Sequence, residues 1–376
     1  MSHCENPLWP CAMTGAVACL AGFEDVAVIV HGSSGCYFYP ASLLPYPIYG
    51  SHLLETEIIF GSGSRLQDVV TRMPGTHAAV AVVTTCVPSL VGEDIHALLA
   101  GVGGVLVVDA PGFIGQFERG WQAAQQVLPA RVDPEKTGVN IDGLNPIDPF
   151  YRGNVLEARR LLSLAGLSPG TFFSSDRFQS LSQSGAYTLS TNPDLTGTVG
   201  TPAGSLLGLE ATRRAFRTLG DRYPAMDGDA VEKEIARAEE RISKVCDKFL
   251  RRHNPPAVAI FGSRSYALHA ADLLTYSLDA SILCIGSRNG PVHAAYPAEE
   301  MTEFPSIKER IERDHPDLVL GSSYEQSVCG DAAFVPLTPP IRGRIFLHAR
   351  PLIGPEGALL LIEEVLNGCL DRMKKR

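Results

Sequence analysis

The sequence predicts an α/β protein built from doubly wound, parallel sheets. Three observations support this class: short continuous apolar runs, a polar or glycine-rich turn at the end of each run, and helical spacing of apolar residues between them. Such runs are typical of parallel strands that helices cover on both faces. A length of 376 residues corresponds, at about 100–200 residues per domain, to two or three such units.

The first unit is expected over residues 1–145. A helix of small residues should begin at Ala12, and three buried strands should follow. Each strand ends in a turn, and the carboxyl ends of parallel strands form the ligand crevice of such a sheet, so the three turns should lie close together. The predicted strands span residues 26–30, 78–83 and 105–108.

Two further units follow, over residues 150–254 and 255–376. Residues 138–153 are dense in Gly, Pro, Asn and Asp, which predicts a connector. In the second unit, helices are predicted over 155–164, 206–219 and 230–252. In the third unit, strands are predicted over 257–261, 280–285 and 317–320, and a final helix over 356–372.

The composition is that of an ordinary globular protein. Hydrophobic residues make up 45% and charged residues 19%, with a mean hydropathy of +0.06. The 41 Asp and Glu exceed the 32 Lys and Arg, giving a net charge of −9, the wrong sign for a nucleic acid or an anionic membrane as partner. No secretory signal is evident at the N-terminus, and the most apolar stretch, residues 97–108, is shorter than the roughly 18 residues of a membrane span. We therefore expect a cytoplasmic protein.

Three cysteines fall at the predicted ligand edge of the first sheet or at a helix start. Cys11 precedes the first helix, and Cys36 and Cys86 follow the first two strands. Helix N-termini favour thiolates, and three converging thiolates suit an iron–sulfur cluster. The alternative is that all three are small core residues, the commonest role of a free cysteine. Core cysteines have no reason to prefer turns, so we favour ligation.

The remaining cysteines are expected to be structural or accessory. Close C-x(2–4)-C pairs, which structural zinc sites usually show, do not occur. Cys4 is near enough to Cys11 to be an accessory ligand, and Cys329 in a loop is left without a role. Four others fall on predicted helices or strands and are assigned to the core: Cys19, Cys246, Cys284 and Cys369.

Taken together, these motifs resemble nitrogenase component 1. The resemblance is carried by Cys11, by V-H-G-S-S-G-C at 30–36 and by T-T-C-V-P-S-L-V-G-E-D at 84–94, which look like that family's cluster-binding half. G-T-P-A-G at 200–204, G-L-E-A-T at 208–212 and R-P-L-I-G-P-E-G-A at 350–358 look like its interdomain and C-terminal signatures. The superfamily also contains protochlorophyllide and chlorophyllide reductases and the nickel-sirohydrochlorin reductive cyclase.

Two departures from the nitrogenase pattern are informative. No cysteine occurs between Cys86 and Cys246, where the resemblance would place a cofactor ligand, and Ile353 stands where the cofactor histidine would precede Gly354. The resemblance therefore implies three stacked α/β units with an iron–sulfur cluster but no iron–molybdenum cofactor, and a function other than dinitrogen reduction. It implies an unsaturated substrate, most plausibly a tetrapyrrole bearing carboxylates.

The resemblance also implies partners. No G-x-x-x-x-G-K-[ST] phosphate loop occurs, so ATP coupling would come from a separate ATP-dependent iron–sulfur reductase that passes single electrons. Three cysteines leave one ligand of a 4Fe–4S cluster unsupplied. We therefore expect a fourth ligand from a partner subunit, or a larger cluster shared across a homodimer or with a homologous second chain.

A substrate carboxylate could be held at F-G-S-R-S, residues 261–265. This segment follows a strand and opens a helix, so backbone N–H groups, Ser263 and Arg264 are candidate ligands, with an ordinary capped helix start as the equal alternative. A different class of function is also open, a non-catalytic scaffold on which a metal cluster or cofactor is assembled. A third possibility, a binding protein whose cysteines all lie in the core, predicts no iron.

Overall fold

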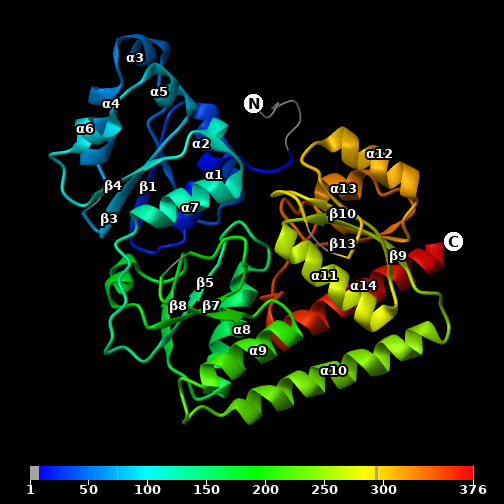
Figure 1. Cartoon of the computed structure of the whole chain (residues 1–376). Helices are drawn as coiled ribbons and strands as arrows, with labels where there is room; N and C mark the ends of the chain where they lie inside the picture. Colours follow the sequence, from blue (N-terminus) through cyan, green and yellow to red (C-terminus); the bar gives the residue numbers. More distant parts are fainter. Residues whose placement is uncertain (1–7, 74, 198, 293–294, 376) are drawn as a thin grey trace.

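A computed structural model describes residues 8–375 except 74, 198, 293 and 294, and it shows three α/β units (Figure 1). Each unit contains one sheet of parallel strands. The first unit lies above the second in this view, and the third lies beside both. The predicted fold class is confirmed.

The first sheet has the order β2-β1-β3-β4, and helices cover both faces. Its strands are β1 (Val26–His31), β2 (Tyr49–Gly50), β3 (Ala79–Thr84) and β4 (Val105–Asp109). The apolar side chains of β1 alternate between two cores, with Val28 and Val30 facing α1 (Ala12–Ala21) and α7 (Phe117–Val127) and Ile29 facing α4 (Gly63–Thr71) and α6 (Ile95–Leu99). Burial on both faces explains the unbroken apolar run of this strand.

The second sheet has the order β6-β5-β7-β8, and none of its strands was predicted from the sequence. The predicted connector over 138–153 is wrong, because it contains β5 (Val139–Asp142) and the start of α8 (Tyr151–Leu164). Asn140 interrupts the apolar pattern of β5, yet its side chain is buried and bonds the N–H and C=O of Gly185 at 2.7 and 2.8 Å. The other strands are β6 (Pro169–Phe172), β7 (Tyr187–Ser190) and β8 (Thr201–Ser205).

Helices α9 (Leu209–Gly220) and α10 (Gly228–Leu250) follow the second sheet, close to the predicted bounds. The amphipathic stripe of α10 includes Val231, Ile235 and Ile242, all buried in a core that continues into the third unit. Helix α10 runs along the bottom of the molecule from the second unit to the third (Figure 1).

The third sheet has the order β11-β10-β9-β12-β13. Its strands are β9 (Ala257–Gly262), β10 (Ser281–Ser287), β11 (Ala298–Glu300), β12 (Leu318–Gly321) and β13 (Ala333–Pro336), and its helices are α11 (Arg264–Leu278), α12 (Phe304–Asp314), α13 (Ser323–Val328) and α14 (Gly354–Lys375). Leu8 packs into the core of this unit and its N–H bonds Thr302 O at 2.9 Å. The described chain thus passes from Leu8, on the third unit, to Cys11 in the first. No helix in the described part of the chain is both long and apolar enough to cross a membrane.

Candidate iron–sulfur site

The three predicted cluster ligands all lie at the start of a helix at one end of the first unit. Cys11 is the N-cap of α1, Cys36 lies in the first turn of α2 (Ser34–Leu43), and Cys86 is the first residue of α5 (Cys86–Val91). Cys36 and Cys86 therefore belong to helices rather than to the turns expected for them. All three thiols are half-buried. The three candidate ligands thus lie on three different helices of the same unit.

Gly112 joins two of these cysteines. A Cβ on Gly112 would stand 3.3 Å from both the Cys11 Sγ and the Cys86 Sγ, so the two sulfurs share one small space beside this glycine. The Gly112 N–H also donates a hydrogen bond to the Cys86 Sγ at 3.1 Å. Glycine at this position leaves open the space that a side chain would fill.

Cys36 lies on the neighbouring helix α2. Its Sγ accepts a hydrogen bond from the Ser33 hydroxyl at 3.6 Å. Tyr39 lies one turn further along α2, near Cys11. Partial burial raises the pKa of Tyr39 to about 12, and the neighbouring Tyr324 and the Cys11 thiol add to this shift. The structure thus places Cys11 and Cys86 together and brings the helix of Cys36 beside them.

The donor chemistry fits an iron–sulfur cluster better than a single metal ion. Among the described residues, no group of three His, Cys, Asp or Glu is arranged to hold one ion. Thiolates without imidazole or carboxylate partners are the ligands of iron–sulfur clusters. The buried Thr85 hydroxyl, beside Cys86 and against Gly32, has no hydrogen-bond partner in the described structure. A bound group could satisfy such an orphaned donor.

Exposed apolar side chains lie on the helices of Cys36 and Cys86 and on the short helix that begins at Gly112. We name them the apolar rim; they come from α2, α5 and the short helix η1 (Gly112–Ile114), and they are Phe38, Tyr39, Leu90, Val91, Phe113 and Ile114. Phe38 is 63% exposed and Leu90 is 74% exposed. Large apolar side chains concentrated at one edge are typical of an interaction surface.

A half-buried carboxyl lies next to this region. Glu118 of α7 accepts hydrogen bonds from the Trp9 indole N–H, which is 3.1 Å from each carboxylate oxygen. Trp9 precedes Cys11 in the segment W-P-C. Burial raises the pKa of Glu118 to about 7. The only sequence signal for this residue is its place shortly after the predicted turn at 109–112.

A chain of hydrogen bonds ties together the loops after β1 and β3. His31, fully buried at the end of β1, contacts the Ser51 hydroxyl through Nδ1 at 3.1 Å and the Ser62 hydroxyl through Nε2 at 2.9 Å. Ser62 in turn donates to the Glu93 carboxylate. Burial lowers the pKa of His31 and the nearby Glu93 opposes this shift; the imidazole joins the loops that follow β1 and β3.

The predicted carboxylate site at the start of α11 is filled by the protein itself. The buried Asp194 accepts hydrogen bonds from the Arg264 Nη2 at 3.0 Å and from the Ser265 N–H at 2.8 Å. Ser263 is the N-cap of α11 and is buried. The contacts therefore match the alternative of a capped helix start, and they tie the second unit to the third.

The C-terminal signature also joins units. The Asn154 side-chain oxygen accepts hydrogen bonds from Leu352 N at 2.8 Å and Ile353 N at 3.4 Å. Gly354 N donates to Leu206 O at 2.8 Å. Ile353 is fully buried. R-P-L-I-G thus packs the start of α14 against α8 and the turn between β8 and α9.

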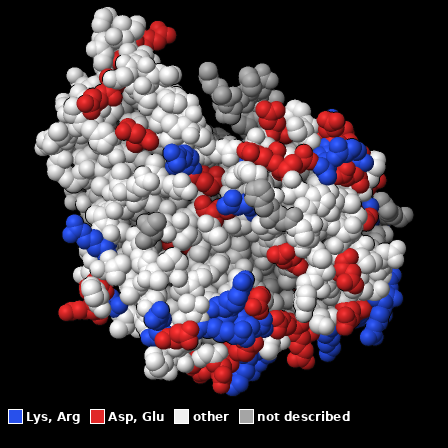
Figure 2. All heavy atoms as spheres, viewed as in Figure 1, with Lys and Arg blue, Asp and Glu red and all other residues white. Residues whose placement is uncertain are grey.

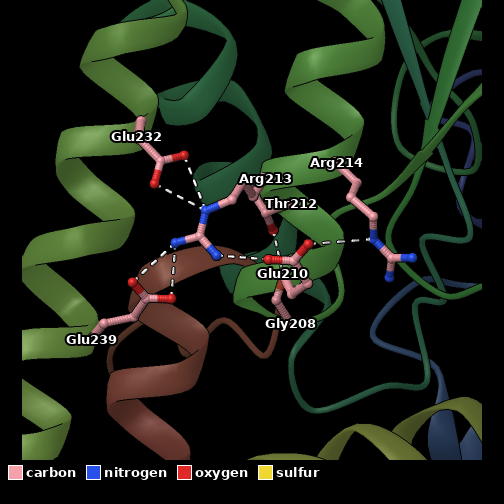
Figure 3. Close-up of polar contacts among 7 residues, drawn as sticks. All are labelled: Gly208, Glu210, Thr212, Arg213, Arg214, Glu232 and Glu239. Atoms are coloured by element: carbon pink, nitrogen blue, oxygen red, sulfur yellow. Dashed lines mark hydrogen bonds and ion pairs between the residues drawn. The ribbon is translucent and has the colours of Figure 1, made fainter.

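A cavity of about 680 Å³ lies between the N-terminus of α9 and one face of α11, with His269 in its wall. Arg213 beside it is held by three carboxylates: its Nε donates to Glu232, its Nη1 to Glu210 at 2.7 Å and its Nη2 to Glu239 at 2.9 Å (Figure 3). Arg214 also reaches Glu210 at 3.8 Å. Because carboxylates outnumber guanidinium groups there, this cavity does not favour an anionic ligand.

The four cysteines assigned to the core are placed as expected. Cys19, Cys246, Cys284 and Cys369 are buried in the core. Cys329 is half-buried at the C-terminus of α13, where its thiol donates to Gln326 O at 3.2 Å. Cys4 lies outside the described residues.

A family model and several known proteins match this chain. The family described as "Nitrogenase component 1 type Oxidoreductase" matches residues 11–370. The nitrogenase molybdenum-iron protein beta chain of Sinorhizobium fredii is 24% identical, with 98% of this chain and 84% of that one aligned. The cofactor biosynthesis protein NifE of Rippkaea orientalis is 31% identical over 134 residues, which cover 31% of this chain and 28% of NifE.

A solved structure shows the same fold. The structure described as "Nitrogenase Cp1 at pH 6.5" superimposes with a TM-score of 0.84 at 17% identity, covering 99% of this chain and 94% of that chain. The family match spans nearly the whole chain, including all three candidate ligands. This chain belongs to the nitrogenase component 1 type oxidoreductases.

Proposed function

We propose that this protein is the electron-accepting subunit of a nitrogenase-like reductase, with an iron–sulfur cluster held by Cys11, Cys36 and Cys86. The observation that carries the proposal is the shared space of the Cys11 and Cys86 sulfurs at Gly112, beside the helix of Cys36. When bound, such a cluster supplies one-electron transfer.

Anaerobic purification tests this assignment. We expect about four irons and matching acid-labile sulfide per one or two chains, with an EPR signal in the reduced state. Cys36→Ala should lose most of the iron. Cys329→Ala, which alters a half-buried thiol elsewhere, should retain it. Wild-type protein that contains no iron and cannot be reconstituted with it would indicate that the three cysteines are structural core residues, and would refute the proposal.

The apolar rim supports a second subunit over the cluster, either a second copy of this chain or a homologous one. Three thiols leave a 4Fe–4S cluster one ligand short, and a partner covering the rim would supply the fourth ligand or share a larger cluster. The visible face of the first unit carries few charged side chains, in contrast to the region of α9 and α10 (Figure 2). The relatives named as beta chains are likewise components of a larger protein.

Sedimentation of the iron-loaded protein tests this arrangement. A homodimer that Phe38→Asp together with Phe113→Asp converts to monomers would show that the rim joins identical chains. An iron-loaded monomer that dimerises only with a second, homologous chain would show a heteromeric site. A stable monomer with a complete cluster would contradict the need for a partner.

Electrons would come from an ATP-dependent iron–sulfur reductase, because this chain has no phosphate loop of its own. We infer an unsaturated substrate, most plausibly a carboxylate-bearing tetrapyrrole, rather than dinitrogen. The absence of cysteine between Cys86 and Cys246 and the buried Ile353 support this choice and a site without an iron–molybdenum cofactor. Turnover of candidate tetrapyrroles with a reductase and ATP, monitored by absorption, is the direct test.

The matches to NifE, a cofactor biosynthesis protein, favour a second candidate, a scaffold for cluster or cofactor assembly. They cover about a third of this chain, whereas the beta-chain alignment covers 98% of it. A scaffold would transfer its metal group to an acceptor protein and show no turnover. Transfer of iron label to an acceptor, measured beside substrate reduction, separates the two functions.

A further inference from the structure

Glu118 is linked to the segment that leads into Cys11 and to the segment of Gly112, which contacts the Cys86 sulfur. Its helix, α7, follows directly from the segment of Gly112, which contacts both sulfurs. The carboxylate is bound by the Trp9 indole on the segment that leads into Cys11. The Cys11 backbone also pairs with Gln116, and Ala12 N bonds Gly115 O at 3.0 Å. Glu118 is therefore rigidly coupled to the cluster-binding segments without touching a ligand.

The same carboxyl lies where the three units meet. Glu118 belongs to the first unit, and the charges that face it are Asp194 from the second and Arg264 from the third. Asp194 and Arg264 are already paired with each other at 3.0 Å. Among the described residues, no Lys, Arg or His forms an ion pair with Glu118 itself. Its one direct side-chain donor is Trp9.

This environment makes the carboxyl titratable near neutral pH. Removal from water disfavours the charged form, and Asp194 adds a smaller repulsion. The Trp9 N–H and Arg264 act in the opposite direction by favouring the carboxylate. A half-buried acid near the cluster-binding segments, held by its own backbone N–H and by the neutral Trp9 indole, has the properties of a proton store.

We propose that Glu118 takes up the proton that accompanies each electron delivered to this site. This inference rests on the proposed function, because it requires a bound cluster. The electron comes from the partner reductase. The proton comes from water and forms an O–H bond on one Glu118 oxygen, so the added negative charge is neutralised nearby. When the electron moves on to the substrate, the proton leaves Glu118 and the carboxylate is restored.

Electrostatics gives the direction of this coupling. An electron added near a carboxylate in a poorly screened interior raises the affinity of that carboxylate for a proton. By linkage, the reduction potential of the bound iron must then fall as pH rises through the range in which Glu118 titrates. A residue with a purely structural role would not produce such a slope.

A redox titration of the iron, followed by EPR between pH 6 and pH 9, tests the proposal. Wild-type protein should show a potential that falls by up to about 59 mV per pH unit over part of this range. Glu118→Gln, with the same shape but no titration, should be flat. Glu24→Gln, an exposed glutamate of the same unit, should behave as wild type. A flat wild-type profile, or an unchanged slope in Glu118→Gln, would overturn the proposal.

A second variant tests the proposal if Glu118→Gln fails to retain its iron. Trp9→Phe removes the donor that favours the carboxylate, so the pH at which the slope begins should move upward; an unchanged onset would also overturn the proposal. Failure of the proposed function gives a different result. Wild-type protein would then bind no iron, whereas full iron with a flat profile contradicts only the role of Glu118.

Discussion

The backbone N–H of Gly112 lies 3.1 Å from the Sγ of Cys86 and donates a hydrogen bond to it. This bond ties the segment after β4 to the thiol that follows β3. Gly112 also lies beside the Cys11 sulfur. One glycine thereby fixes the distance between segments that are far apart in the chain.

Gly112→Ala should lower cluster retention. The added Cβ would stand 3.3 Å from the Cys11 and Cys86 sulfurs, in the space that a bound group would share with them. Changes next to metal ligands typically cost about 10-fold or more in affinity, and we expect a comparable loss of iron under chelator challenge. Gly103→Ala, which meets open space, is the matched control. Equal iron retention in the two variants would contradict a cluster at Gly112.

Thiol labelling should separate the cysteines into two classes. Burial raises the pKa of Cys246 and Cys369 to about 11 and that of Cys284 to about 12, and it also raises the pKa of Cys19. At pH 8 these four should stay protonated and inaccessible to iodoacetamide. In iron-free protein, Cys11, Cys36 and Cys86 should label quickly, as shown by peptide mass spectrometry. Iron loading should protect these three. Burial also raises the pKa of Cys329, so this thiol should label more slowly than the three and its rate should not change with iron.

Glu325→Gln should strongly destabilise the protein. Arg288 and Glu325 form an ion pair whose side chains are 1% and 0% exposed, and Arg288 also donates to Met301 O at 2.7 Å. Removing the charge leaves a buried guanidinium without its counter-charge, which costs about 3–5 kcal/mol in the free energy of unfolding. Urea denaturation measures this loss. Glu312→Gln, which breaks the exposed pair with Lys308, should cost less than about 1 kcal/mol. Similar losses in both variants would contradict this account.

His269 should make stability depend on pH. Burial lowers the pKa of this imidazole to about 4, whereas in the unfolded chain it titrates near its ordinary value. Between these values the unfolded state binds a proton that the folded state does not, so the free energy of unfolding falls as pH falls. The expected contribution is about 2 kcal/mol between pH 7 and pH 5.

His269→Gln tests this contribution. The variant should lose less stability than wild type on going from pH 7 to pH 5, as measured by urea unfolding at both values. His348→Gln, at an exposed position, should follow wild type. A parallel loss in wild type and His269→Gln would show that His269 does not titrate as its burial requires.

Elements with a strong local pattern could be predicted from the sequence. Strand β1 is a continuous apolar run because both its faces are buried, and α10 carries an apolar stripe at helical spacing. Cys36 and Cys86 were placed near one edge because parallel strands end on the same side of a sheet. Strand β5 was missed because Asn140 interrupts its pattern, and only the buried contacts with Gly185 make this residue compatible with a strand.

The edge of the sheet was predictable, but the partners of its side chains were not. The spacing of apolar residues along the chain predicts the order of strands and helices. The candidate ligands Cys11, Cys36 and Cys86 follow from their positions at the predicted ends of strands and start of a helix. Three features join segments from different loops or units: the space at Gly112, the hydrogen bond from Arg264 to Asp194, and the hydrogen bond from Trp9 to Glu118. Such contacts depend on how the three units pack. They cannot be predicted from the local spacing of residues, because that spacing does not depend on the packing of distant segments.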